Sequence, residues 1–299
     1  MALRIGTSTA GSTFYTQGSA IAELVNRSGL VGNMRVIETS LASVDNANRL
    51  DKGEIEFGFM ASNWIGLARD GAPPFDRKIA LRMASPANAG PIFFITLARS
   101  GIKTIPDLKG RRVAVGPKGS GMARHVDTIF GVLGISPGDF TPFYLDFPEG
   151  ADALVAGEID AQFQPPIPNA VMTGLSERAE VRVVPYAQGQ IEKILSEVSF
   201  YRRVTMERGA FRGIKEDIPQ VAVVNVLVTH ERVDADAVCA VVKTMIENTG
   251  TLARMNPLFK GLAELYEPLR SKGPAALEMG GVPLHPGALR AYKEAGLIA

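Results

Sequence analysis

Short apolar runs alternate with amphipathic stretches over the first sixty residues, and this alternation narrows the possible folds more than any other feature of the chain. Apolar runs at 3–7, 34–39 and 55–60 predict β-strands, and the segments 14–28 and 43–53 between them have the spacing of amphipathic helices. A strand–helix–strand–helix–strand order favours a mostly parallel sheet flanked by helices. The sequence therefore predicts an α/β protein.

The same order returns in the middle of the chain. A strand predicted at 111–116 precedes a helix at 120–134, and a strand-like run at 143–147 precedes a helix that ends at Gly157. The segment Gly-Glu-Ile-Glu-Phe at 53–57 is echoed by Gly-Glu-Ile-Asp-Ala from Gly157 onward, and in both a strand with an acid follows a glycine. We therefore expect two lobes of similar architecture, the second inserted into the first.

The joints between these lobes are expected where the chain is extended. Two extended runs lie between 79 and 98, and a strand-like run at 221–229 precedes a helix at 233–249. No low-complexity linker separates the segments. The predicted lobes are residues 1–90 with 222–299 for the first and residues 91–221 for the second.

Charge and cysteine content exclude several function classes. The 299-residue chain has 32 basic and 31 acidic residues, so its net charge of +1 gives no reason to expect a nucleic-acid partner. Its single cysteine, Cys239, excludes an internal disulfide and a cysteine-based metal cluster, and its three histidines show no metal-ligand spacing. We expect no cofactor and no metal.

The sequence leaves the cellular location open. No apolar run approaches the roughly 18–20 residues that a membrane-spanning helix needs. The chain begins MALRIGTS, so the first strand starts almost at once and no signal peptide precedes it. The protein is then either cytoplasmic or a chain from which a targeting segment has been removed.

The glycine-rich segment 113–125, VAVGPKGSGMARH, has the form of a turn that holds an anion. A Walker phosphate loop is excluded because Lys118 precedes the glycine pair. What remains is a strand, glycines, Ser120 and a helix start, where exposed N–H groups and the helix dipole attract a negative group. Taken alone, the segment is explained more simply as a tight turn with Ser120 as the helix N-cap.

Two further junctions have the same character. GTSTAGSTFYTQG at 6–18 and SLASVDNANRL at 40–50 place Gly, Ser, Thr and Asn between a strand and a helix, with Ser43 as the predicted N-cap of the second helix. In open α/β sheets, ligands bind beyond the carboxyl ends of the strands. Three such junctions over two lobes therefore predict one binding cleft.

These junctions resemble those of a known family. GTSTAGSTFYTQG is similar to the G-T-x-x-x-G-G-T-Y-Y-x-x-G segment of TAXI-type solute receptors, the extracytoplasmic binding proteins of TRAP transporters. The segments 39–63 and 101–125 resemble that family's S-V-x-N segment and its I-x-x-x-x-D-L-K-G-K-x-V-x-x-G-x-x-G-S-G-T segment. ADALVAGEIDAQF and the C-terminal VPLHPGALRAYKEAGL are also similar, so the likeness runs in order from about residue 3 to 297.

The resemblance implies a two-lobed type II periplasmic-binding fold with its ligand cleft between the lobes. It implies a monomeric periplasmic receptor without catalytic residues, its signal peptide removed. The implied partners are a small organic acid or amino acid and the permease subunits of a TRAP-type secondary transporter. The residues implied to bind the ligand are Thr9, Thr13, Tyr15, Ser43, Asn46, Ser62, Lys118, Gly119, Ser120, Gly121 and Met122.

Several positions depart from the family pattern. Met122 stands where threonine is usual, and Ala61 and Asn63 stand where a glutamine and an aspartate are common. Lys118 adds a positive charge beside the glycine pair. These departures weaken the expectation of a glutamate-like ligand and are compatible with a different carboxylate.

An enzyme interpretation stays open beside the receptor. GTSTA at 6–10 is close to the G-x-S-x-G elbow of serine hydrolases, which would make Ser8 a nucleophile, although Ala10 breaks the pattern. An enzyme on the same two-lobed fold and a cytoplasmic sensor domain are further alternatives, but no cofactor-anchoring motif or attached signalling segment supports them. His125 and Trp64 are expected to be packing residues, and His285 is expected to brace the turn before the last helix.

Overall fold

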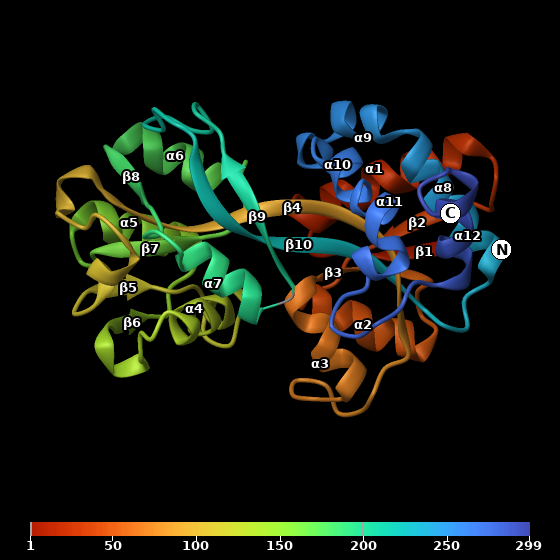
Figure 1. Ribbon diagram of the computed structural model, residues 1–299, viewed down its shortest axis with the longest axis horizontal. Helices are drawn as coiled ribbons and strands as arrows, with labels where there is room; N and C mark the ends of the chain where they lie inside the picture. Colours follow the sequence, from red (N-terminus) through yellow and green to blue (C-terminus); the bar gives the residue numbers. More distant parts are fainter. Residues whose placement is uncertain (1, 199) are drawn as a thin grey trace. The chain divides into compact units, whose positions relative to one another are not determined.

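The chain forms two compact units. The computed structural model describes residues 2–198 and 200–299. Unit 1 contains the residues up to Ala89 together with Val224–Ala299, and unit 2 contains Gly90–Val223. Each unit has its own sheet and its own helices, which the colours of Figure 1 trace along the chain.

Two long strands carry the chain from one unit into the other. They are β4 (Leu81–Leu97) and β10 (Ile218–His230) (Figure 1). The two extended runs expected between 79 and 98 are the single strand β4, because its pattern of buried residues continues through Pro86 and Pro91 without a turn.

The sheet of unit 1 has the strand order β2–β1–β3–β10. The strands β2 (Met34–Ile37), β1 (Leu3–Gly6) and β3 (Phe57–Ala61) are parallel, and β10 is antiparallel to β3. Helix α1 (Thr13–Ser28) lies on one side of this sheet and α2 (Ser43–Lys52) on the other (Figure 1). The remaining helices of unit 1 are α3 (Ile65–Asp70), α8 (Ala235–Glu247), α9 (Thr249–Met255), α10 (Leu262–Tyr266), α11 (Pro268–Lys272) and α12 (Pro286–Glu294).

The sheet of unit 2 repeats this plan with different strands. The order is β6 (Thr141–Phe143), β5 (Arg112–Ala114), β7 (Ala161–Gln164) and β4, with β8 (Val181–Val184) also paired to β4 and β9 (Tyr201–Met206) paired to β10. β5 is parallel to both β6 and β7, whereas β4 is antiparallel to β7 and β8. The helices of unit 2 are α4 (Gly121–Val132), α5 (Phe147–Ala156), α6 (Ala170–Arg178) and α7 (Gln190–Glu197).

The predicted α/β class is confirmed, but the sheets are mixed rather than mostly parallel. The reason is that the two strands that link the units, β4 and β10, run antiparallel to their neighbours. The strand expected at 143–147 is displaced, because β6 covers Thr141–Phe143 and shares only Phe143 with the predicted range. It ends at Phe143, because Asp146 already accepts a hydrogen bond from the N–H of Glu149 as the N-cap of α5.

The two similar sequence segments, which begin at Gly53 and Gly157, accept equivalent hydrogen bonds in the two units. In unit 1, Arg4 donates from its main-chain N–H to Glu56 at 2.7 Å and from its guanidinium to the carbonyl of the glycine that ends α2 at 2.9 Å. In unit 2, Arg112 donates to Asp160 at 2.8 Å and to the carbonyl of the glycine that ends α5 at 3.0 Å. Glu56 therefore ties β1 to the turn before β3, and Asp160 ties β5 to the turn before β7.

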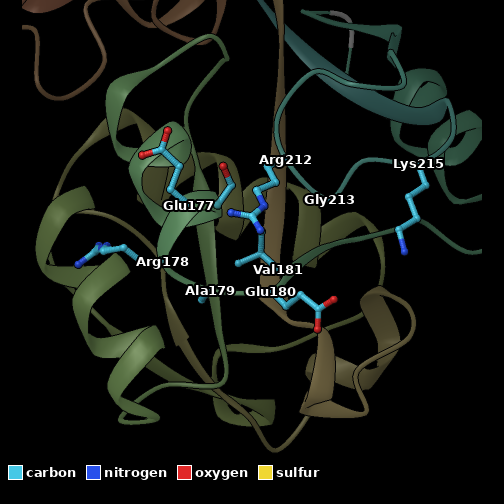
Figure 2. A pocket seen from close by; sticks show the side chains of 9 residues that line it. Glu177, Arg178, Ala179, Glu180, Val181, Arg212, Gly213 and Lys215 are labelled. Atoms are coloured by element: carbon cyan, nitrogen blue, oxygen red, sulfur yellow. The ribbon is translucent and has the colours of Figure 1, made fainter.

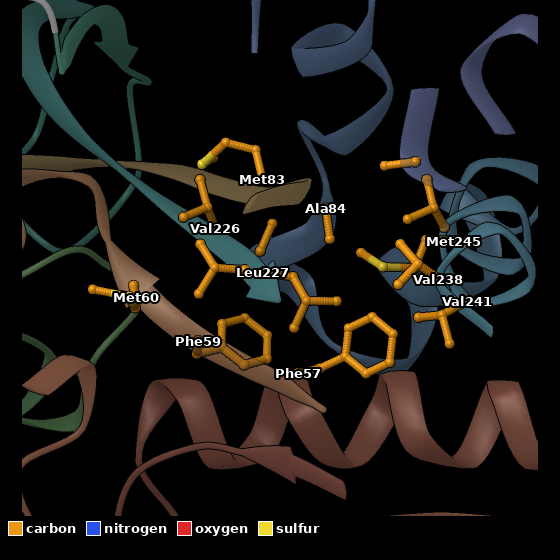
Figure 3. Close-up of a cluster of buried hydrophobic side chains, with 14 of the residues drawn as sticks. Phe57, Phe59, Met60, Met83, Ala84, Val226, Leu227, Val238, Val241 and Met245 are labelled. Atoms are coloured by element: carbon orange, nitrogen blue, oxygen red, sulfur yellow. The ribbon is translucent and has the colours of Figure 1, made fainter. Parts of the chain in front are cut away.

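The core of unit 1 fills the space between the sheet and α8. Phe57 and Phe59 of β3 and Leu227 of β10 are fully buried, and they belong to one cluster with Val238 and Met245 of α8 (Figure 3). Burying side chains of this size is the main favourable contribution to folding. In the part of the chain that the structure describes, no helix is both long and apolar enough to cross a membrane.

Candidate functional site

The carboxyl ends of β1, β2 and β3 meet at one edge of the unit 1 sheet, where the amide of Asn46 joins them. Its Nδ2 donates to the carbonyl oxygens of Thr7 and Phe59, both at 2.8 Å, and its Oδ1 accepts from the Thr39 hydroxyl at 3.2 Å. A Cβ on Gly6 would lie 2.4 Å from this Oδ1, so glycine is required there. Because Asn46 is completely buried, it holds the three strand ends together from within.

Helix α2 starts differently from the prediction. Ser43 is not its N-cap: the cap position is Ala42, at a φ of 45°, and Ser43 is the first helical residue. The Ser43 hydroxyl accepts from the N–H of Ala61 at 3.1 Å, so it links α2 to the end of β3 instead. Asp45 accepts hydrogen bonds from two N–H groups of the preceding loop, at 3.1 and 3.2 Å.

The first turn of α1 carries N–H groups that no side chain caps. Ser12 occupies the cap position, but its hydroxyl donates to the carbonyl of Thr9 at 2.5 Å and contacts the hydroxyl of Ser8. Thr9 and Thr13 are exposed beside it. Uncapped N–H groups at the positive end of a helix dipole favour an anion. This turn therefore presents uncapped main-chain donors beside two exposed hydroxyls.

A carboxylate that the sequence analysis missed stands in the same turn. Glu38, the residue after β2, is exposed, and its Oε2 accepts from the N–H of Ala10 at 3.0 Å. The signal in the sequence was an acid directly at the carboxyl end of a predicted parallel strand. It gives the edge of unit 1 a negative group suited to a hydrogen-bond donor or a cation.

In unit 2 the corresponding turn leads from β5 into α4. Ser120 is the N-cap of α4, as the sequence predicted, and its hydroxyl accepts a hydrogen bond from an N–H of the first turn at 3.2 Å. The N–H groups of Gly121 and Met122 have no acceptor within the helix. Lys118 and Gly119 are exposed in the turn itself, and Gly119 has a φ of 76°. Backbone donors and one lysine thus surround the start of α4.

Three residues expected to be structural are buried and bonded. The ring Nδ1 of His125 lies 2.7 Å from the hydroxyl of Tyr201, and burial, with Arg124 nearby, lowers its pKa to about 3. Trp64 is buried in the turn after β3, and His285 caps the first turn of α12 with its Nδ1. The neutral His125 ring packs inside unit 2.

The resemblance also implied that Tyr15 and Ser62 bind the ligand, and the structure shows what surrounds each of them. Tyr15 lines an open groove of about 470 Å³ along α1, together with Ser19, Glu23 and Met255. Ser62 is buried in the 3₁₀ turn that follows β3.

Unit 2 contains a buried pair of glutamines that the sequence analysis also missed. Gln162 donates from Nε2 to the carbonyl of Phe147 at 2.9 Å, and Gln164 donates from Nε2 to the Oε1 of Gln162 at 2.8 Å. Both side chains are buried, and the Oε1 of Gln164 has no partner among the described residues. Polar residues at alternate positions of an otherwise apolar strand were the available signal.

A surface cavity of about 410 Å³ lies elsewhere in unit 2 (Figure 2). It is formed at the end of α6 and the start of β8, with Glu177, Glu180, Arg212 and Lys215 among its lining residues. It therefore opens at the amino end of β8, which is parallel in direction to β7, and not at the carboxyl edge where α4 begins. Its charges are of both signs, and none of the predicted ligand residues lines it.

The Ser8 hydroxyl contacts the hydroxyl of Ser12, whereas the nucleophile of a serine hydrolase is hydrogen-bonded to a base. Within residues 2–198 and 200–299, no group of three or more metal-ligating side chains is found. What both edges offer is N–H and O–H donors, one lysine and one carboxylate.

Comparison with known proteins shows both a family and a fold. The model of the NMT1-like family matches residues 5–296. The periplasmic aliphatic sulphonate binding protein SsuA from Escherichia coli is 18% identical, with a TM-score of 0.50 over 98% of this chain and 82% of that one. A protein from Methylobacillus flagellatus KT assigned as a periplasmic sulfonate-binding SsuA is 15% identical, with a TM-score of 0.56 over 99% and 95% of the two chains.

A third similar structure is that of a solute binding protein with a different name. The TctC solute binding protein from Polaromonas is 15% identical, with a TM-score of 0.54 over 88% of each chain. At these identities the likeness is one of fold. The predicted periplasmic-binding fold class is therefore confirmed.

Proposed function

The chain belongs to the NMT1-like family, and from that premise we propose that it is an extracytoplasmic solute-binding receptor of a TRAP-type transporter. In this proposal it is a monomeric, non-catalytic periplasmic protein of the TAXI type. Its two units close on a small organic carboxylate or amino acid and deliver it to the membrane permease. The residues proposed to form the site, by contact or by positioning, are Thr9, Thr13, Tyr15, Ser43, Asn46, Ser62, Lys118, Gly119, Ser120, Gly121 and Met122.

The observation that carries this proposal is the length of the match. The family match runs from residue 5 to 296, and the M. flagellatus protein shares the fold over 99% of this chain and 95% of its own. Two of the similar structures are named as periplasmic sulfonate-binding proteins and the third as a solute binding protein, which supports a receptor for a small anion.

The starts of α1 and α4 support an anionic ligand. A negative group at a helix N-terminus is stabilised by about 0.3–1 kcal/mol when exposed and by up to about 2 kcal/mol when partly buried. The exposed hydroxyls of Thr9 and Thr13 and the ammonium of Lys118 add further donors. Because Asn46 and Ser43 are buried in the scaffold, they serve this site by positioning the turns, and Thr9, Thr13 and the α4 start make the contacts.

A TRAP-type permease is favoured over an ATP-driven one by sequence likeness. The segments 6–18, 39–63 and 101–125 resemble TAXI receptors, whereas the likeness to the M. flagellatus protein, which is named as part of a sulfonate ABC transporter, is one of fold. Uptake by vesicles that contain a TRAP permease should then depend on this protein and on an ion gradient. Uptake that requires ATP instead would contradict the TRAP assignment.

A thermal-shift screen tests the receptor function. A ligand present at 100 times its Kd raises the free energy of unfolding by about 2.7 kcal/mol, which raises Tm by several degrees. We expect such a shift with members of a panel of carboxylates, amino acids and sulfonates. A panel without any shift, confirmed by calorimetry, would reject a receptor for these classes.

A proline substitution tests whether main-chain N–H groups of α4 hold the anion. Gly121→Pro removes one donor at the first helical position, where proline is tolerated, and Ser120 already has the extended backbone (φ −70°, ψ 160°) that precedes proline. We expect the affinity measured by titration calorimetry to fall by about ten-fold or more, the value of one charge-assisted hydrogen bond. Ala170→Pro, at the first position of α6, is the matched control and should leave affinity unchanged.

A further inference from the structure

The orientation of the Gln164 amide is fixed by the main-chain carbonyl of Phe147. Two hydrogen bonds in series connect them, with the amide of Gln162 in between. The carbonyl oxygen of Phe147 can only accept, so the group of Gln162 that meets it at 2.9 Å is the Nε2 donor. The remaining atom of that amide, Oε1, can also only accept, so Gln164 must present its Nε2 to it, at 2.8 Å. The Oε1 of Gln164 is therefore the outward atom, and turning either amide over would set like groups against each other.

This outward oxygen is an acceptor without a donor. Gln164 is 0% exposed, and its Oε1 has no hydrogen-bond partner among the described residues. A buried acceptor left unpaired has given up its hydrogen bonds to water without a replacement, which is unfavourable. Such groups are rare in folded proteins, and each needs a physical explanation, such as a functional role or an ordered water or ion.

The register of the sheet places Gln164 at the edge where α4 begins. β7 pairs with β5 in parallel, with Ala114 opposite Gln162. Two residues further along, Gln164 is level with Gly116, the first glycine of the turn that leads to Ser120. Its amide nitrogen reaches back to Gln162, so its oxygen is the amide atom that Gln162 does not use.

We infer that Gln164 is a specificity-determining residue whose Oε1 accepts a hydrogen bond from the ligand, which is an anion that also carries a hydroxyl or amino group. The inference rests on the proposed receptor function and narrows its ligand class. The anionic group meets the N–H groups at the start of α4, and the hydroxyl or amino group beside it meets Gln164. An anion without such a donor leaves the buried oxygen unpaired and binds less tightly.

Three pairs of compounds that differ only in the donor test this ligand class. The pairs are malate and succinate, glutamate and glutarate, and taurine and ethanesulfonate, each titrated into the wild-type protein by calorimetry. We expect a donor-bearing member to bind at least about ten-fold more tightly than its partner, which corresponds to about 1.4 kcal/mol. Equal affinity within every pair that binds would overturn the inference.

Substitutions at Gln164 test whether this residue makes the distinction. Gln164→Met and Gln164→Leu remove the acceptor, and both should bring the affinities of the two members of a pair together. The exposed Gln188→Met in the same unit is the control and should keep the wild-type ratio. A ratio that persists in the Gln164 variants would overturn the inference, as would a buried water that satisfies Oε1.

The outcomes separate the inference from the function on which it rests. Binding of the paired compounds without discrimination rejects the role of Gln164 and leaves the receptor intact. Binding of none of the six compounds rejects both. Each substitution transfers the unpaired acceptor from Gln164 to Gln162, so the melting temperatures of the variants should stay near that of the wild type; if neither variant folds, the wild-type ratios still decide the ligand class.

Discussion

At the scale of single residues, Asn46 shows how a position in a binding motif can serve the scaffold. Its Nδ2 donates to the main-chain carbonyls of Thr7, just after β1, and Phe59 of β3. Its Oδ1 accepts a hydrogen bond from the hydroxyl of Thr39, which follows β2. A motif that contains Asn marks the position as polar. Only the fold shows that its donors are used internally.

Replacing Asn46 by aspartate should therefore lower stability and not merely affinity. Asn46→Asp keeps the shape but loses both donors and turns a carboxylate toward two carbonyl oxygens. We expect the free energy of unfolding, from urea titration, to fall by at least about 2 kcal/mol. Asn48→Asp on the same helix makes no such contact and should change little; an equal urea midpoint for the two variants would contradict the scaffold role.

At the scale of elements, the distance between α5 and β7 depends on a glycine in the helix. A Cβ on Gly150 would lie 2.4 Å from the Nε2 of Gln162, which is inside any normal contact. The glycine thus lets α5 approach β7 closely enough for Gln162 to reach the carbonyl of Phe147. Gly131, near the end of α4, has open space at the same position.

Alanine substitutions at these two glycines should have opposite effects. Gly131→Ala should raise the free energy of unfolding by about 0.5–1 kcal/mol, because alanine is the better helix former. Gly150→Ala gains the same propensity but displaces the Gln162 amide, so we expect a net loss of about 1–3 kcal/mol. Chemical denaturation of both variants measures the difference, and a stabilised Gly150→Ala would show that α5 can move away from β7.

At the scale of the whole molecule, all three histidines have a pKa below the ordinary value. Burial lowers the pKa of His125 to about 3 and also lowers the pKa values of His230 and His285. They lie in both units, one in unit 2 and two in unit 1. The unfolded chain therefore takes up more protons than the folded one below the ordinary histidine pKa.

Stability should consequently fall on the acid side of pH 6.5. Each histidine contributes fully above its unfolded pKa of about 6.5 and loses that contribution as the pH falls toward the folded value. For His125 alone the loss at pH 5 is on the order of 2 kcal/mol. Urea unfolding between pH 7.5 and 5 measures this slope, and His125→Gln should reduce it; an unchanged slope in the variant would mean that His125 is not the group that titrates.

Much of the fold is encoded in local sequence patterns. The periodicity that predicted strands and helices over the first sixty residues is confirmed by β1, α1, β2, α2 and β3, because side-chain spacing and glycine stop signals act over a few residues. The polar turn at Ser120 was recognisable for the same reason. The likeness to solute receptors was readable from motif order along the whole chain.

Other features were decided only when distant segments met. The continuity of β4 and the mixed sheet follow from strand pairing, which periodicity does not report. Ser43 lost its predicted capping role to a contact with Ala61, and Gln164 acquired its unpaired oxygen through a relay that starts at Phe147. Local sequence thus determined which segments are helix, strand or donor-rich turn. Tertiary structure alone decided which polar groups are satisfied and which are left for a ligand, because hydrogen-bond partners far apart in sequence compete for the same atoms.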